Sequence, residues 1–117
     1  MKKWILKDKS FSFAIRIVNL YKHLSEEGKE YIMSKQVIRS GTSVGAMIRE
    51  AEHSESKADF IHKLAIAQKE INETLYWLEL LQETNYLSTK EFESIYADAT
   101  EIIKLITSSL KTIKSSD

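Results

Sequence analysis

Apolar residues recur at three- and four-residue intervals along nearly the whole chain of 117 residues. This spacing is typical of one face of an α-helix and differs from the two-residue alternation of a half-buried strand. Proline is absent, and glycine occurs only at positions 28, 41 and 45. Few residues are therefore present that interrupt helices or form the turns of a β-sheet protein. The pattern predicts an all-α domain.

Four amphipathic segments can be separated by their apolar stripes. The spacing predicts helices over residues 10–26, 29–52, 57–84 and 89–114, with residues 1–9 and 115–117 as terminal tails. The short links between these segments favour antiparallel neighbours. We therefore expect one domain, residues 10–114, folded as an antiparallel up-and-down four-helix bundle.

Residues at the predicted helix ends support these boundaries. Gly28 is expected to adopt a left-handed conformation after the first helix, and Asn85 to end the third. Ser56 is placed to cap the third helix. Ser88 and Glu91 have the spacing of a capping box for the fourth helix.

Two glycines lie inside the second predicted helix. Gly41 and Gly45 are four residues apart and therefore share one helical face. Together they cost about 2 kcal/mol of helix stability relative to alanine. We expect this face to approach another helix closely, either within one subunit or between subunits.

Composition and charge exclude several classes of protein. The chain contains no cysteine, so it can form neither disulfides nor thiolate-based sites. The short apolar run around Trp4 is too short for a signal peptide or a membrane span, and we expect a cytoplasmic protein.

The net charge is zero, but residues 1–40 hold nine basic and four acidic groups, whereas residues 41–117 hold eight and thirteen. The candidate nucleic-acid contacts are basic residues of this first segment: Lys2, Lys3, Lys7, Lys9, Arg16 and Lys22.

Three charged residues fall near the glycine face. Arg39 and Glu50 are eleven residues apart, about three helical turns, and so point in similar directions. Glu73 on the third predicted helix is placed to reach Arg39 across an antiparallel pair. Such a pair fixes helix register, and a ligand or partner site is the alternative. With Gly41 and Gly45, these three residues define a structural seam.

Carboxylate and imidazole groups one helical turn apart raise a second alternative. Glu50 with His53 and Asp59 with His62 have spacings related to those of di-iron sites in four-helix bundles. Both pairs flank one turn, however, where a solvated turn with a capping Asp59 is the simpler interpretation. The serines and histidines show no arrangement typical of nucleophilic catalysis.

Some apolar residues lie off the main helical stripes. They are Phe11, Ile15, Tyr76, Trp77 and Leu80. They either fill the core or form a subunit interface, and we favour the interface because aromatic residues are enriched there.

The segment from Arg39 to Ala51 and the start of the third helix resemble a small bacterial family known as four helix bundle proteins, or ribosomal RNA intervening-sequence proteins. Ile48, Glu50, Ser56, Asp59 and Phe60 match its pattern, and Leu64, Ile66, Ala67 and Glu73 continue the match. Met47, Ala51 and Ser54 depart from it.

The resemblance implies an up-and-down bundle that assembles as a homopentamer and has no catalytic site, and we expect neither a cofactor nor a metal. It also implies two possible partners, nucleic acid and reverse transcriptase, because one branch serves as the accessory protein of diversity-generating retroelements. No small-molecule substrate is evident. We therefore expect a non-catalytic scaffold or adaptor, with a di-metal carboxylate enzyme as the alternative.

Overall fold

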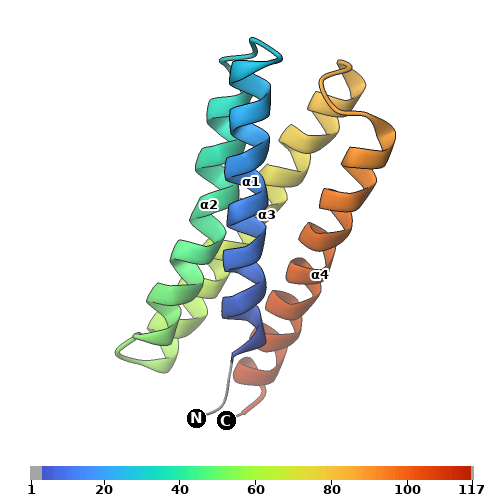
Figure 1. Ribbon diagram of the computed structural model, residues 1–117. Helices are drawn as coiled ribbons and strands as arrows, with labels where there is room; N and C mark the ends of the chain where they lie inside the picture. The colour runs from blue at the N-terminus through green and yellow to red at the C-terminus, as the bar shows by residue number, and fades with distance from the viewer. Residues whose placement is uncertain (1–3, 117) are drawn as a thin grey trace.

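The computed structural model describes residues 4–116, which contain four α-helices and no β-strand. The helices are α1 (Ile5–Glu26), α2 (Met33–Glu52), α3 (Lys57–Glu83) and α4 (Thr89–Lys114), and they run alternately up and down (Figure 1). The molecule is elongated, with principal extents of 49 × 24 × 21 Å. The predicted all-α, antiparallel four-helix bundle is confirmed.

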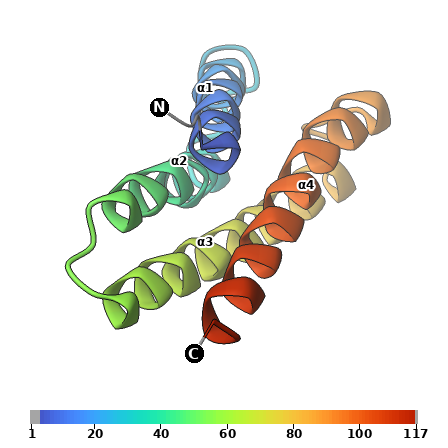
Figure 2. The same ribbon diagram turned by 90° about the horizontal axis from the view of Figure 1, so that it is seen from below.

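The helices follow one another around the bundle in chain order. α2 contacts α1 and α3, and α4 contacts α3 and, least extensively, α1 (Figure 2). The backbones of α1 and α3 do not come close to each other, so these two helices lie diagonally across the bundle. In Figure 1, α1 and α4 diverge toward the end that carries the α1–α2 and α3–α4 connections.

The first helix begins earlier than the sequence suggested. α1 starts at Ile5 and not near Ser10, so residues 5–9 are helical and do not belong to a tail. The reason is that Leu6 continues the buried stripe of Phe13 and Ile17 about two turns further toward the N-terminus. Residues 1–3 and 117 of the expected tails lie outside the described residues.

The connection between α1 and α2 also differs from the prediction. Lys29, and not Gly28, adopts the left-handed conformation, with φ of +54°. α2 then begins at Met33, four residues later than expected. The Glu30 carboxylate accepts hydrogen bonds from the backbone N–H groups of Ile32, Met33 and Ser34 and so caps the helix. Glutamate is not a preferred capping residue, which is why this cap was missed.

The remaining helix ends follow the sequence. The Ser56 hydroxyl accepts the N–H of Asp59 at the start of α3. Asn85, with φ of +68°, follows the end of α3. At the start of α4, Ser88 and Glu91 form the expected capping box with both reciprocal hydrogen bonds.

The two helical glycines face α1 within the same chain. A Cβ atom added at Gly41 would lie 2.8 Å from Cγ1 of Ile17, a fully buried side chain. At Gly45 the nearest atom would be the carbonyl oxygen of Ser10, at 3.4 Å. The glycine face therefore allows α2 to approach α1 closely, and this seam is internal to the subunit.

Candidate functional site

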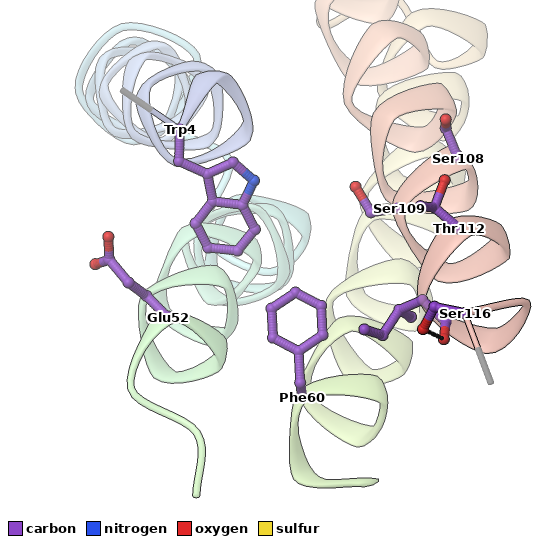
Figure 3. Close-up of a pocket in the computed structure, with 8 residues that line it drawn as sticks. Trp4, Glu52, Phe60, Ser108, Ser109, Thr112 and Ser116 are labelled. Atoms are coloured by element: carbon purple, nitrogen blue, oxygen red, sulfur yellow. Dashed lines mark hydrogen bonds between the residues drawn. The ribbon is translucent and has the colours of Figure 1, made fainter. Parts of the chain in front are cut away.

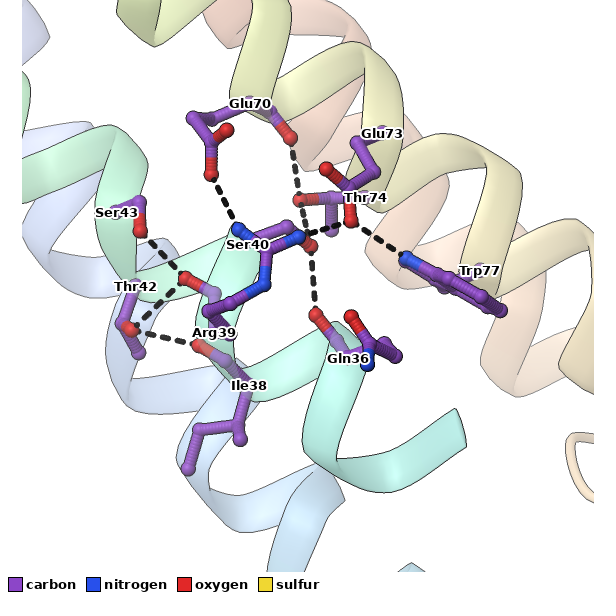
Figure 4. A network of polar contacts seen from close by, with 10 residues as sticks. All are labelled: Gln36, Ile38, Arg39, Ser40, Thr42, Ser43, Glu70, Glu73, Thr74 and Trp77. Carbon is purple, nitrogen blue, oxygen red and sulfur yellow. Dashed lines mark hydrogen bonds and ion pairs between the residues drawn. The ribbon is translucent and has the colours of Figure 1, made fainter. Parts of the chain in front are cut away.

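The most extensive polar cluster in the bundle joins α2 to α3 (Figure 4). Arg39 donates a hydrogen bond of 3.1 Å to Oε2 of Glu70 and a second hydrogen bond to Glu73. The indole N–H of Trp77 donates to the same Glu73 oxygen at 2.9 Å. The expected contact between Arg39 and Glu73 is thus present, although the Arg39 side chain remains 49% exposed.

A second, buried layer of hydrogen bonds lies beneath these charges. The Thr74 hydroxyl is 2.9 Å from Oγ of Ser40, and both residues are completely buried. Ser40 in turn donates to the carbonyl oxygen of Gln36 on the preceding turn. Among the described residues, no buried side-chain polar atom lacks a hydrogen-bond partner. The two layers fix the position of α2 along α3.

The contacts in this cluster favour the ionised forms of Glu73 and Arg39. The hydrogen bonds from Trp77 and then from Arg39 hold the pKa of Glu73 below its ordinary value, against the opposing effect of desolvation. The same contact with Glu73 raises the pKa of Arg39. A carboxylate with a lowered pKa that is already bound to two donors is a poor general base. The arrangement therefore supports a cross-link between helices better than an acid–base site.

Glu50 does not join this cluster. Its carboxylate accepts a hydrogen bond of 2.9 Å from Nζ of Lys63 near the α2–α3 connection, and this bond raises the pKa of Lys63. The other seam residues divide between two neighbours of α2, because the glycines face α1 whereas Arg39 faces α3. The structure thus separates a set that helical spacing alone had grouped.

The carboxylate–histidine pairs also lie at this connection and not in the bundle interior. The side chain of His53 is 81% exposed, and Asp59 accepts the backbone N–H of Glu55 at the start of α3. Across residues 4–116, no group of three or more His, Cys, Asp or Glu side chains is arranged to hold a metal ion. The geometry does not favour the di-metal alternative.

The off-stripe apolar residues form two surfaces. On α1, Phe11 and Ile15 are about half exposed, and the Arg49 guanidinium of α2 lies 4.9 Å from the Phe11 ring centroid. On α3, Tyr76 is 58% exposed and meets Trp77 edge-on. The two surfaces belong to diagonal helices and are therefore separate.

Leu80 and Trp77 contribute less than expected to the α3 surface, because both are partly buried. Other large apolar side chains, which were not among the predicted interface residues, are also exposed. They are Ile5, Tyr31, Ile32 and Tyr86, of which Ile32 is 78% exposed. Tyr31 and Ile32 lie in the connection before α2. Their exposure was not predicted, because the sequence placed them inside the second helix.

Three of the candidate nucleic-acid contacts are paired inside the molecule. Arg16 bonds to Asp98 at 2.7 Å and Lys9 to Glu101 at 2.9 Å, both across the sparse contact between α1 and α4. Lys7 bonds to Glu52 at 2.9 Å. Lys22 is exposed, and Lys2 and Lys3 lie outside the described residues. Lys7, Lys9 and Arg16 therefore form ion pairs with neighbouring helices of the same chain.

A pocket of about 540 Å³ lies near the two chain ends (Figure 3). Trp4 and Phe60 stack with ring centroids 6.0 Å apart on one side, and the hydroxyl-bearing Ser109 and Thr112 of α4 stand on the other. Its one ionisable lining residue, Glu52, is bonded to Lys7. The pocket offers no pairing of a nucleophile with a base.

None of the helices described in residues 4–116 is long and apolar enough to cross a membrane. A family model described as 23S rRNA-intervening sequence protein matches residues 2–108. A crystal structure of a protein of unknown function from the S23 ribosomal protein family of Bacteroides thetaiotaomicron is 62% identical to this chain. The two align with a TM-score of 0.91 over 92% of this chain and 99% of that one. No curated protein matches the chain.

Proposed function

This chain belongs to the 23S rRNA-intervening sequence protein family, and from that premise we propose that it is a non-catalytic, homo-oligomeric scaffold or adaptor of the cytoplasm. The observation that carries the proposal is the exposure of Phe11, Ile15 and Tyr76 although the bundle core is already closed. Large apolar side chains grouped on a folded surface are typical of contacts with another macromolecule. The stoichiometry of five subunits comes from the family resemblance.

The internal contacts support a scaffold more than an enzyme. The polar cluster around Arg39 links two helices, and the apolar pocket near Trp4 holds one ionisable side chain that is already paired. These features stabilise a rigid body with exposed contact surfaces. A purified protein that retained two equivalents of iron or manganese, and lost them in His53→Ala and His62→Ala variants, would contradict this interpretation.

Light scattering tests the assembly directly. At micromolar concentration the protein should elute with about five times the 13.5 kDa mass of the chain. A different oligomer would retain the scaffold proposal and correct its stoichiometry. A monomer at that concentration would refute the proposal.

We propose a protein partner, such as the reverse transcriptase implied by the family resemblance, in preference to nucleic acid. Lys7, Lys9 and Arg16 are engaged in ion pairs, which leaves Lys22 as the exposed candidate among the described ones. If RNA or DNA nevertheless binds, its affinity should fall steeply with salt. Lys22→Gln should then weaken binding more than the matched variant Lys9→Gln. Absence of a mobility shift at low salt would remove nucleic acid from the proposal.

A further inference from the structure

The exposed apolar residues of α1 are bordered by basic groups. Phe11 and Ile15 are one helical turn apart, and Lys22 follows seven residues after Ile15 on the same stripe. Arg49 of α2 covers one edge of Phe11, and Lys35 lies two heptads before Arg49, on the same side of α2. These five residues form what we call the basic surface. Asp8, three residues before Phe11, and Glu26, four residues after Lys22, are the two carboxylates on the same stripe of α1, so basic groups remain in excess.

The exposed apolar residues of α3 are bordered by acidic groups. Tyr76, Glu79, Leu80 and Glu83 have the spacing of one helical face, and Glu79 and Glu83 are exposed. These four residues form what we call the acidic surface. Lys69, one heptad before Tyr76, is the cation on the same stripe. The two surfaces thus share apolar centres and carry opposite net charge.

The position of the two surfaces determines how copies of the chain can join. α1 and α3 are diagonal in the bundle, so their outward faces point to opposite sides (Figure 2). In a two-fold contact, a surface of one subunit would meet the same surface of the other subunit. Like charges would then lie opposite each other. A head-to-tail contact instead brings opposite charges together and leaves both surfaces available for the next subunit.

We propose that the basic surface of one subunit docks on the acidic surface of the next, in a head-to-tail contact. This inference rests on the proposed homo-oligomeric function and specifies the interface that builds the assembly. Repetition of this contact produces a closed ring when the rotation between subunits closes, and an open filament when it does not. The charged borders give the contact its direction, because the reversed pairing is repelled.

Complementation between two variants tests the proposal. Ile15→Glu blocks the basic surface and Tyr76→Lys blocks the acidic surface, and both positions are about half exposed, so the bundle should remain folded. Each variant alone should be monomeric in light scattering. An equimolar mixture should form a heterodimer, since Ile15→Glu keeps an intact acidic surface and Tyr76→Lys keeps an intact basic one.

Ile5→Glu is the matched control, because Ile5 is a similarly exposed isoleucine of α1 outside the basic surface. It should leave the oligomer intact. Charge reversal by Arg49→Glu should weaken association at least about tenfold, and added salt should weaken the wild-type contact in the same direction. Circular dichroism of every variant should match that of the wild type, so that loss of assembly is not loss of fold.

The outcomes separate this inference from the proposed function. A monomeric wild type refutes both. A wild-type oligomer that persists in either single variant shows that the protein assembles through another surface, and refutes the head-to-tail contact alone. Two monomeric variants that fail to recombine also refute it, because the intact acidic surface of Ile15→Glu would then not bind the intact basic surface of Tyr76→Lys.

Discussion

Alanine substitution at the two helical glycines should have opposite effects on stability. At either position alanine adds about 0.5–1 kcal/mol of helix stability relative to glycine. At Gly41 the new Cβ would lie 2.8 and 2.9 Å from Cγ1 and Cγ2 of Ile17, far inside van der Waals contact. Ile17 is completely buried, so these branched carbons cannot move without disturbing the core.

Overpacking of this kind costs about 1–3 kcal/mol. Gly41→Ala should therefore lower the free energy of unfolding by about 1 kcal/mol after the gain in helix propensity is subtracted. At Gly45 the nearest atom, the Ser10 carbonyl oxygen, is 3.4 Å away, which is ordinary contact. Gly45→Ala should retain its gain and raise the free energy of unfolding by about 0.5–1 kcal/mol.

Urea unfolding followed by circular dichroism measures both changes. All variants must be compared at one protein concentration, because assembly adds a concentration-dependent term to stability. Equal slopes of the unfolding free energy against urea would show that the midpoints report stability alone. The argument would be refuted if Gly41→Ala were as stable as Gly45→Ala.

A double-mutant cycle identifies the atoms responsible. Ile17→Ala removes the carbons that the new methyl group would meet. It should therefore cost about 1 kcal/mol less in the Gly41→Ala background than in the wild type. Strict additivity of the two substitutions would show that Ile17 is not the obstacle.

Three further predictions concern local polar contacts. Ser88→Ala should cost about 1 kcal/mol in urea unfolding because it removes the cap of α4, whereas Ser108→Ala, at an exposed mid-helix position, should be nearly neutral. Glu30→Ala should cost about 1–3 kcal/mol in the same assay because three N–H groups at the start of α2 lose their acceptor, and an unchanged midpoint would contradict this role. The lowered pKa of Glu73, caused chiefly by its hydrogen bond from Trp77, stabilises the fold above the ordinary glutamate pKa and is lost as the pH falls through the lowered value. Glu73→Gln should thus flatten the acid limb of a stability–pH curve, and an identical limb would disprove the linkage.

The sequence was sufficient for the parts of the fold that depend on local interactions. Helical periodicity located all four helices, and the α4 capping box was predicted to the residue because Ser88 and Glu91 meet within one turn. The start of α1 and the α1–α2 connection were placed incorrectly. There the outcome depended on the burial of Leu6 and on the unusual capping by Glu30, which local propensity does not encode.

The candidate sites were less predictable because they depend on neighbours distant in sequence. The Arg39–Glu73 contact could be anticipated from antiparallel pairing, but the second contact of Arg39, with Glu70 of α3, was not predicted. From the sequence, Lys9 and Arg16 were predicted to be available for nucleic acid. Their partners, Glu101 and Asp98, lie on α4 and come close to α1 only in the folded bundle.

The sequence by itself determined that this chain forms four amphipathic helices, since a helical stripe and a helix cap are set by residues within a few positions of one another. The tertiary structure decided which faces those helices share. Gly41 and Gly45 look equivalent in the sequence, yet one meets the branched side chain of Ile17 and the other the backbone of Ser10. That difference arises from the relative position of α1 and α2, which is set by packing across the whole bundle.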